Sequence, residues 1–443
     1  MAVEVDVDVV VLGLGAGGEY AARKLAEAGL DVVGIERDLV GGECPFWGCT
    51  PSKLLIHSAQ VGDDWSRAAA RIREANHDWS DDTHAGPLED AGVRIVRGRG
   101  RLAGPGRVRV EDQTYVARLG VVLNTGTDPA VPDVPGLAGS PYWTNREVVR
   151  QEAAPASLAV LGGGPIGCEL AQAFARFGTR VTLIEAQDRL LGPEEPEAAE
   201  SIARVLRADG VDVRLGAELT GVRHEDGFRL DLAGDVVAAE HLLVAVGRSP
   251  NLTEIGLETV GLDPAADRVP TDERMRAGEG LWAVGDITGL GAFTHLSLSQ
   301  ARVVVRDLLG TDGPWADHRA VSRVTFTDPE VGAVGLTEVE ARDAGLSVAV
   351  GRADIESSSR GWIAEVEGVV KVVADTDRGV LVGGTVVAPA GGEVLGLLTA
   401  AVHAEIPVSS LREMHFAYPT LHRAIAAALA DLTSGPDPSR SGV

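Results

Sequence analysis

Val7-Asp8-Val9-Val10-Val11-Leu12-Gly13-Leu14-Gly15-Ala16-Gly17-Gly18 is the segment that most strongly indicates the fold of this 443-residue chain. Its apolar run predicts a buried strand, and its glycines predict a tight turn into the alanine-rich helical segment 20–26. A second strand is expected at 32–35, closed by Glu36. Such glycines let the backbone approach a pyrophosphate at a helix N-terminus, and the acid can accept hydrogen bonds from a ribose. The segment predicts a dinucleotide-binding module, with these cofactor contacts: Gly13, Gly15, Gly18, Glu36 and its neighbour Arg37.

The same unit recurs later in the chain. A strand at 158–161 leads into Gly162-Gly163-Gly164-Pro165-Ile166-Gly167, then a helix at 169–174 and a strand at 181–184 that ends at Glu185. In both copies the first glycine precedes the acid by 23 residues. Two dinucleotides and electron transfer between them are the economical explanation, and because both copies keep their glycines and acid, one decayed copy is the weaker alternative.

Glu185 indicates which nicotinamide nucleotide the second module prefers. A carboxylate there accepts from a free 2′-hydroxyl and repels a 2′-phosphate, which favours NADH. Arg180 and Arg189 lie close in sequence and leave NADPH open.

A second informative segment is Gly41-Gly42-Glu43-Cys44-Pro45-Phe46-Trp47-Gly48-Cys49-Thr50-Pro51-Ser52-Lys53. A helix is expected to begin just after Cys49, with Thr50 as N-cap and Pro51 at the first helical position. Cys49 would then lie at the positive end of a helix, which favours its reactive thiolate. An isolated pair is more often structural, but two neighbouring dinucleotide modules favour a redox-active one.

Length and composition narrow the class of protein. A chain of 443 residues is expected to form two to four domains. No apolar run is long enough to cross a bilayer, and the early strand leaves no room for a signal peptide. Only three cysteines suggest a reducing, cytoplasmic setting. The net charge of −25 argues against nucleic acid and anionic membranes as partners.

Taken together, these motifs resemble the class I pyridine nucleotide–disulfide oxidoreductases, the group of lipoamide dehydrogenase, glutathione reductase and mercuric reductase. Residues 41–53 resemble the redox-disulfide signature of that family. The resemblance spans about residues 7–420, and further segments carry it: 124–129 and 244–251 for the crossovers, 281–286 for the segment that holds the FAD ribityl chain, and 326–338 for the start of the dimerisation domain.

The resemblance implies an α/β fold with two Rossmann-like dinucleotide-binding domains and a C-terminal α+β dimerisation domain. It implies FAD at the first nucleotide site, NADH or NADPH at the second, a small-molecule electron acceptor, and a homodimer with its active site across the interface. No resident metal is expected. The implied domains are an FAD-binding domain (1–145), an NAD(P)-binding domain (146–252), a return to the FAD domain (253–318), and a dimerisation domain (319–443) with a disordered tail from about residue 433.

The family pattern also implies roles for single residues. Cys49 would be the flavin-proximal thiolate and Cys44 the thiol that exchanges with substrate. Lys53 and Glu169 match an ion pair beside the reactive flavin nitrogen. The other cofactor-binding candidates are Gly42, Lys53, Thr125, Gly126, Gly162, Gly164, Gly167, Glu185, Gly247, Arg248, Gly285 and Asp286.

The C-terminal motif departs from the family pattern. Disulfide-reducing relatives carry His-Pro-Thr and a following glutamate, whereas this chain has Tyr418-Pro419-Thr420-Leu421-His422-Arg423. A tyrosine is a poor general base at neutral pH, and an arginine cannot accept a hydrogen bond to orient an imidazole.

Three explanations of this departure stay open. In the first, the electron acceptor is a metal ion, a quinone or a similar compound that needs little proton transfer. The chain would then be a diaphorase-like or metal-reducing enzyme that works without thiol exchange. Alternatively, His422 replaces the missing base beside Tyr418. In the third explanation the chain is a nucleotide-sensing flavoprotein with little turnover. The bulky residues Phe46 and Trp47 inside the cysteine loop either shape an aromatic acceptor site or pack under the flavin.

Overall fold

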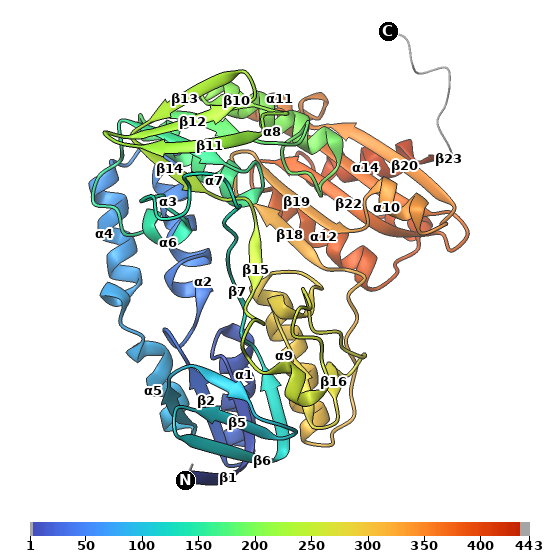
Figure 1. Ribbon diagram of the computed structural model, residues 1–443. Helices are drawn as coiled ribbons and strands as arrows, with labels where there is room; N and C mark the ends of the chain where they lie inside the picture. Colours follow the sequence, from blue (N-terminus) through green and yellow to red (C-terminus); the bar gives the residue numbers. More distant parts are fainter. Residues whose placement is uncertain (1–2, 435–443) are drawn as a thin grey trace.

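The computed structural model describes residues 3–434, which form three bodies, each built around its own sheet (Figure 1). The N-terminal sheet lies at the bottom of Figure 1, the second at the upper left and the C-terminal one at the upper right. This arrangement confirms the predicted α/β class.

The first sheet has the strand order β16-β17-β6-β1-β2-β3. Its members are β1 (Val3–Leu12), β2 (Val32–Glu36), β3 (Arg94–Arg97), β6 (Gln113–Leu123), β16 (Arg276–Gly278) and β17 (Leu281–Ala283). The first strand pairs in parallel with both β2 and β6, and five of its residues, Val7 and Val9 to Leu12, are buried. A hairpin of β4 (Gly100–Leu102) and β5 (Arg107–Val110) extends the sheet from β6.

Two helices pack together over this sheet, α1 (Ala16–Glu27) and α9 (Thr294–Leu308). Gly17 allows their close approach, since a Cβ there would lie 2.3 Å from Ser297 Oγ. A segment from beyond residue 275 thus returns to the first body, as the implied return to the FAD domain requires.

The second sheet repeats the strand–helix–strand unit. Its order is β10-β9-β8-β14, all parallel, from β8 (Ser157–Leu161), β9 (Arg180–Ile184), β10 (Asp212–Arg214) and β14 (His241–Val244). Its helices are α7 (Pro165–Arg176) and α8 (Pro196–Ala208). An antiparallel sheet of β11 (Leu219–His224), β12 (Phe228–Leu232) and β13 (Asp235–Ala239) shares a buried core with it.

Two short strands connect the first and second bodies. The chain leaves through β7 (Thr127–Pro129) and returns through β15 (Arg248–Pro250), and these crossover strands pair in antiparallel register. They run through the middle of the molecule in Figure 1.

The C-terminal body is a six-stranded sheet in the order β18-β19-β22-β21-β20-β23. Its strands are β18 (Ser322–Thr325), β19 (Glu330–Gly335), β20 (Val348–Asp354), β21 (Val369–Asp375), β22 (Val380–Ala388) and β23 (Thr433–Ser434). Every residue of β21 and β22 is buried. On one face of the sheet α12 (Gly391–His403) packs on β22 and α14 (His422–Asp431) on β21, whereas side chains of the other face, such as Val369 and Val387, share a core with the second body. The predicted tail starts with β23, which pairs with β20, and otherwise lies outside the described residues.

The remaining helices are short or lie between the bodies. They are α2 (Glu43–Phe46), α3 (Cys49–Gln60), α4 (Trp65–Ala75), α5 (Asp82–Asp90), α6 (Asn145–Val148), α10 (Glu338–Asp343), α11 (Ser359–Ala364) and α13 (Val408–Arg412), with 3-10 turns η1 (His77–Trp79), η2 (Leu257–Val260), η3 (Asp286–Thr288) and η4 (Ile355–Ser357). Within residues 3–434, no helix combines the length and the apolar character that crossing a bilayer requires.

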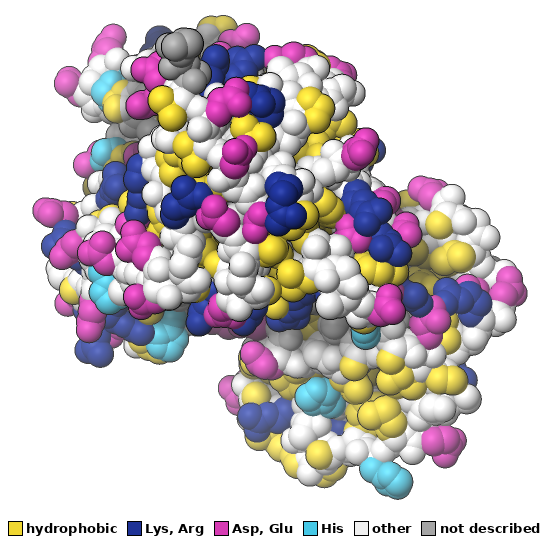
Figure 2. Space-filling view, turned by 90° about the horizontal axis from the view of Figure 1, so that it is seen from below, with side chains coloured by type: hydrophobic (Ala, Val, Ile, Leu, Met, Phe, Trp, Pro, Cys, Tyr) yellow, Lys and Arg dark blue, Asp and Glu magenta, His cyan; other side chains and the backbone are white. Residues whose placement is uncertain are grey.

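On the molecular surface, acidic and basic side chains are interspersed over the face shown in Figure 2. Many of the charged side chains of the protein form exposed ion pairs, such as Arg94 with Asp31 at 2.9 Å. The predicted domain limits of 145, 252 and 318 stay predictions, since the sheets place no boundary at a single residue.

Candidate active site

A cavity of about 1210 Å³ opens where the three bodies meet. All three contribute to its wall. Residues from the predicted site that line it are Gly13, Gly15, Glu36, Arg37, Gly42, Cys44, Cys49, Lys53, Thr125, Gly126, Glu169, Arg248 and Asp286.

The first glycine turn is shaped to receive a dinucleotide. Gly13 has φ of +94°, and a Cβ there would lie 2.2 Å from the Asn124 carbonyl oxygen, so only glycine fits. Around Gly15 the space is more open, since a Cβ placed there would lie 3.6 Å from its nearest neighbour. A pyrophosphate can therefore approach Gly15 at the N-terminus of α1.

Two polar groups at this turn fit the FAD that the family pattern implies. Glu36 Oε2 accepts from the Leu14 backbone N–H at 2.7 Å, and burial raises the pKa of Glu36. Thr125 Oγ1 is buried in the cavity wall with no hydrogen-bond partner among the described residues. A buried hydroxyl without a partner is costly, and a bound polar ligand would satisfy it.

Asn124 is a residue that the sequence interpretation did not single out. Its Oδ1 accepts from the Gly18 N–H at 2.6 Å, and its Nδ2 donates to the Val284 carbonyl at 3.1 Å. Asn124 therefore joins the glycine turn to β6 and to the segment before Asp286. Gly18 and Gly285 lie outside the cavity lining and serve close packing, because a Cβ at either would lie within 2.8 Å of a neighbouring atom.

The cysteine segment forms two helices rather than one. The turn α2 carries Cys44, and α3 begins at Cys49 itself, with Gly48 as its N-cap. The prediction that Thr50 caps this helix is wrong. The Gly48 carbonyl accepts the Ser52 N–H, so the helical ladder already starts before Thr50. Cys49 thus lies in the first helical turn, where unpaired N–H groups favour an anion.

Cys44, Cys49 and Cys168 form no disulfide bond in this structure. Cys49 Sγ lies 3.4 Å from Oγ1 of Thr294, and Thr294 is the first residue of α9. The hydrogen bond from the Cys44 thiol, together with Thr294 and the charge of Lys53, lowers the pKa of Cys49 to about 6 against the opposing effect of burial. The pKa of Cys44 is raised, chiefly by the same hydrogen bond.

Lys53 and Glu169 form the expected ion pair. Lys53 Nζ donates to Glu169 Oε2 at 2.8 Å, and Glu169 Oε1 accepts the Phe326 N–H at 2.7 Å. The Lys53 ammonium also lies 4.6 Å from the centre of the Phe326 ring. The pair joins α3, α7 and the third body at the cavity wall.

The second glycine turn repeats the first. Gly162 has φ of +107°, with the Ala245 carbonyl oxygen 2.4 Å from a Cβ placed there, whereas Gly164 faces open space. Gly167 packs against the Gly162 carbonyl, and Glu185 Oε2 accepts the Gly163 N–H at 2.6 Å. These residues and Gly247 lie outside the cavity lining, but the next part of α7, Pro165 to Leu170, supplies lining residues.

Arg180 and Arg189 are the two residues that left NADPH open as the nicotinamide nucleotide. Arg189 donates to the Gly192 carbonyl at 2.5 Å, and Arg180 begins β9 on an exposed position. Neither is held against Glu185 by a hydrogen bond that the structure describes.

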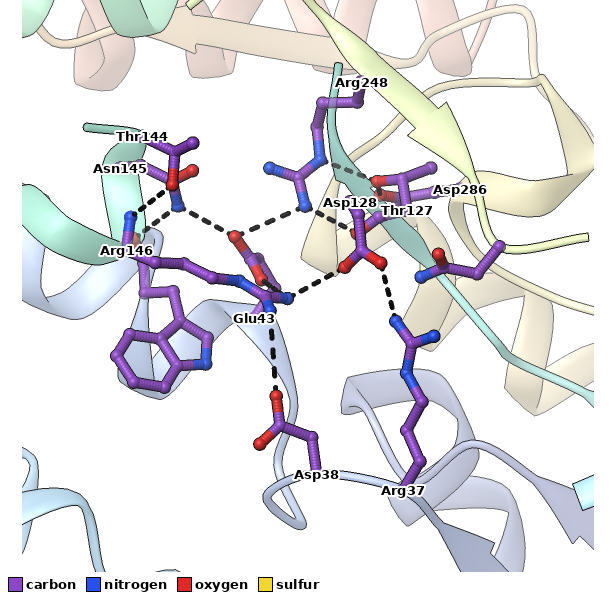
Figure 3. Close-up of polar contacts among 12 residues, drawn as sticks. Arg37, Asp38, Glu43, Thr127, Asp128, Thr144, Asn145, Arg146, Arg248 and Asp286 are labelled. Atoms are coloured by element: carbon purple, nitrogen blue, oxygen red, sulfur yellow. Dashed lines mark hydrogen bonds and ion pairs between the residues drawn. The ribbon is translucent and has the colours of Figure 1, made fainter. Parts of the chain in front are cut away.

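Charged residues around the crossovers form the network of Figure 3. Thr127 Oγ1 donates to Asp286 Oδ2 at 2.7 Å and accepts from Arg248 Nε at 2.6 Å. Arg37 pairs with Asp128 at 2.7 Å. The network brings Arg37, Arg248 and Asp286 from distant parts of the sequence to one wall of the cavity.

Tyr418 and His422 do not join these residues within one chain. Tyr418 is 70% exposed, its hydroxyl donates to Ser359 Oγ at 2.9 Å, and neither residue lines the cavity. His422 is the first residue of α14. Any role of this pair in the redox site therefore requires a second subunit.

Phe46 and Trp47 are packed side chains. They are 2% and 5% exposed, and Trp47 stacks on Trp79 with ring centres 6.1 Å apart. Phe46 is therefore a core residue, whereas Trp47 packs on Trp79 and also lines the cavity.

Two family models match this chain. The pyridine nucleotide-disulphide oxidoreductase model covers residues 7–305, and the dimerisation-domain model of the same family covers residues 321–429. The chain therefore belongs to the pyridine nucleotide-disulphide oxidoreductase family, whose members are FAD-dependent enzymes.

Particular relatives narrow the comparison. A dihydrolipoyl dehydrogenase of Chlorobaculum tepidum is 32% identical, with 96% of each chain covered. A mercuric reductase of Streptomyces lividans is also 32% identical, again with 96% of each chain covered. Among solved structures, the Cu(II) complex of the HOCl-induced flavoprotein disulfide reductase RclA from Escherichia coli has a TM-score of 0.87 at 29% identity and covers 96% of this chain and 99% of that one.

Proposed function

We propose that this flavoprotein disulfide reductase takes electrons from NADH and delivers them through the Cys44–Cys49 pair to a thiol-reactive acceptor. The observation that carries the proposal is the setting of Cys49, at a helix N-terminus, beside Cys44 and Thr294, with its thiolate favoured near neutral pH. Glu185 supports NADH, because the carboxylate would repel a 2′-phosphate.

The first glycine turn would hold FAD, with Glu36 toward the ribose and Asp286 toward the ribityl chain. When bound, FAD supplies a carrier that accepts an electron pair from a nicotinamide and passes it to a disulfide. Cys49 would hold the thiolate on the cofactor side, while Cys44 meets the acceptor. Lys53, fixed by Glu169, would keep a positive charge beside that thiolate.

A soft metal cation is the acceptor that we favour within this class. Reducing a disulfide to two thiols consumes two electrons and two protons, whereas reducing a bound metal ion consumes electrons alone. Tyr418 stands where disulfide-reducing relatives carry a histidine, so the chain lacks the usual proton donor at that position. A mercuric reductase and a Cu(II) complex among its relatives support the same choice.

The dimerisation-domain match supports a homodimer. We propose that Tyr418 and His422 reach the redox pair of the partner subunit, and that the enzyme works in the reducing cytoplasm, where Cys44 and Cys49 remain available.

An anaerobic titration with NADH tests the electron pathway. Uptake of two electron pairs per subunit, with the long-wavelength absorbance of a thiolate beside flavin, is expected. Cys44→Ser and Cys49→Ser should each reduce the uptake to one pair. Steady-state assays with Cu(II), Hg(II), lipoamide and a quinone then identify the acceptor, with NADPH in parallel to NADH.

Two outcomes would favour other functions. Full turnover with a quinone in the double serine variant would indicate a diaphorase that bypasses the cysteines. Slow oxidation of NADH with every acceptor would indicate a nucleotide sensor.

A further inference from the structure

Glu43, the residue before Cys44, lies at the centre of the charged network in Figure 3. Its Oε1 accepts from Asn145 Nδ2 at 2.8 Å, and its Oε2 accepts from an Arg146 nitrogen at 2.9 Å. Arg248 lies 3.3 Å from the same carboxylate. Three donors thus converge on one side chain in the turn that carries an active-site thiol.

These donors belong to elements beyond the first body. Asn145 and Arg146 open α6, which follows the outgoing crossover, and Arg248 begins β15, the returning crossover. Arg146 also pairs with Asp128 on β7 at 3.0 Å. Through Glu43, α2 is therefore tied to both crossover strands and to the start of the second body.

The other end of the turn is held as well. Asn145 Nδ2 also donates to the Trp47 carbonyl at 2.8 Å, and Asn76 Nδ2 donates to the Phe46 carbonyl at 3.0 Å. The Arg150 guanidinium lies 4.4 Å from the centre of the Trp47 ring. With both ends fixed, the position of Cys44 between them is fixed.

The contacts of Glu43 stabilise the turn because several donors bind the same carboxylate. An isolated surface ion pair contributes little. Glu43 has a side chain only 26% exposed, and its partner Arg248 is 18% exposed, so water screens these contacts less than at an open surface. Charge-assisted hydrogen bonds from several donors also fix the orientation of the Glu43 side chain, whereas a single contact would not.

We propose that Glu43 is a positioning residue: by binding Asn145, Arg146 and Arg248 together, it holds the Cys44 thiol against Cys49 and makes that contact depend on the crossover strands. The inference rests on the proposed redox role of the pair. Glu43 itself touches no reacting atom. Its effect reaches the chemistry through the Cys44 thiol, whose interaction with Cys49 lowers the pKa of Cys49.

Thiol alkylation tests this position without turnover. The FAD-loaded, full-length protein is reduced anaerobically and treated with iodoacetamide, and the rate at each cysteine is followed by peptide mass spectrometry. Glu43→Gln keeps an acceptor for Asn145 but removes the charge that holds the arginines. Cys44 should react about three- to tenfold faster, the range expected when local opening loses one or two charge-assisted hydrogen bonds.

Cys168 is an internal control for this experiment, because it is fully buried in α7 and far from the network in sequence. A merely structural loss would speed alkylation at all three cysteines, whereas the proposed effect is confined to Cys44. Glu152→Gln is the matched control variant, since Glu152 is 85% exposed and pairs only with Arg73, at 3.4 Å, among the residues that the structure describes.

A spectroscopic signature gives a second, independent result. The long-wavelength absorbance of the Cys49 thiolate should titrate about half a unit to one unit higher in Glu43→Gln, because the displaced Cys44 thiol no longer stabilises it. Arg146→Gln should reproduce both effects, and the double variant should add little to the larger single effect.

Unchanged alkylation of Cys44 and an unchanged titration midpoint in both single variants would overturn the inference. Acceleration at all three cysteines would overturn it too. Failure of the proposed function is distinguishable, because turnover in the Cys44→Ser, Cys49→Ser double variant would disprove that function without altering the alkylation result.

Discussion

Cys49 shows how a few neighbours set the chemistry of one sulfur atom. A thiol in water ionises near pH 8.5. Here the Cys44 thiol, the Thr294 hydroxyl and the Lys53 charge all favour the thiolate, and together they outweigh burial. The pKa of Cys168 is raised instead, chiefly by burial and also by the charges of Glu169 and Glu185. The pKa values of the two thiols thus shift in opposite directions because their environments differ.

Thr294→Val should shift the ionisation of Cys49. The pKa of Cys49 is lowered to about 6, so the thiolate and its long-wavelength absorbance are present above that pH and are lost as the pH falls through it. Without the hydroxyl, one stabilising contact disappears and the midpoint should move upward. A pH titration of the absorbance measures this shift. Thr399→Val, another change in the cavity wall, should leave the midpoint in place.

Lys53→Met should destabilise the protein because it leaves Glu169 unpaired. The Glu169 side chain is only 5% exposed. Breaking a buried ion pair costs roughly 3–5 kcal/mol, and the 34% exposure of Lys53 places this case at the lower end. Chemical denaturation of FAD-loaded protein gives the difference. Adding Glu169→Gln should recover part of the stability and none of the activity. Equal stability of Lys53→Met and the wild type would contradict this reasoning.

At the scale of elements, the two glycine turns share a design that separates folding from binding. In each turn the first glycine, Gly13 or Gly162, lies against a backbone carbonyl that follows a neighbouring strand. The glycine two residues later, Gly15 or Gly164, faces more open space. The first is needed for the strand-to-helix connection to form. The second leaves room for a ligand.

Gly162→Ala should therefore lower the stability of the protein, whereas Gly164→Ala should weaken the binding of NADH. Alanine at 162 must adopt φ near +107° and meet the Ala245 oxygen, so a loss of roughly 1–3 kcal/mol is expected. Alanine at 164 has no atom to meet, so stability should stay within about 0.5 kcal/mol while NADH binding weakens. Thermal unfolding and a binding titration with NADH measure the two effects. Loss of stability only at 164 would contradict the assignment.

For the whole molecule, Lys371 joins the second and third bodies. Its Nζ lies 2.9 Å from Glu195, 3.0 Å from Glu197 and 3.0 Å from Glu338, and its side chain is 6% exposed. Glu195 and Glu197 belong to the start of α8, whereas Lys371 and Glu338 belong to the C-terminal body. A buried cation with three carboxylates thus fixes the relative position of the two bodies.

Lys371→Met should lower stability by roughly 3–5 kcal/mol, because the buried carboxylate of Glu195 loses its cation. The denaturation midpoint measures this loss. Arg352→Met is the control, since the Arg352–Asp354 pair is half exposed and should contribute within about 1 kcal/mol. Similar losses in the two variants would show that the buried cluster carries no special weight.

Tyr418→His with Arg423→Glu tests the choice of acceptor in the complete dimer. These changes restore the base and the carboxylate that disulfide-reducing relatives carry. Lipoamide reduction should rise at least about tenfold, since general acid–base catalysis contributes 10²–10⁴-fold where it operates. The rate with Cu(II) or Hg(II) should stay unchanged. A wild-type protein that already reduces lipoamide as fast as this variant would refute the metal-ion preference.

Local sequence patterns were enough to predict the two strand–glycine-turn–helix modules and the close pair of cysteines. A strand, a glycine turn and an acid 23 residues further on all lie along one segment, so no distant contact is needed to recognise them. The α/β fold with its C-terminal dimerisation domain and the order of the bodies were predicted only through the resemblance to a family. The Lys53–Glu169 contact was also predicted, but only through the resemblance to a family, because 116 residues separate the two.

The way in which the cysteine pair is held became visible only in the folded chain. The contact of Cys49 with Thr294 and the convergence of Asn145, Arg146 and Arg248 on Glu43 join segments that are about 100 to 245 residues apart. No local pattern encodes those distances. These contacts form when the crossover strands and helices pack against each other, because packing brings side chains from distant segments within hydrogen-bonding distance.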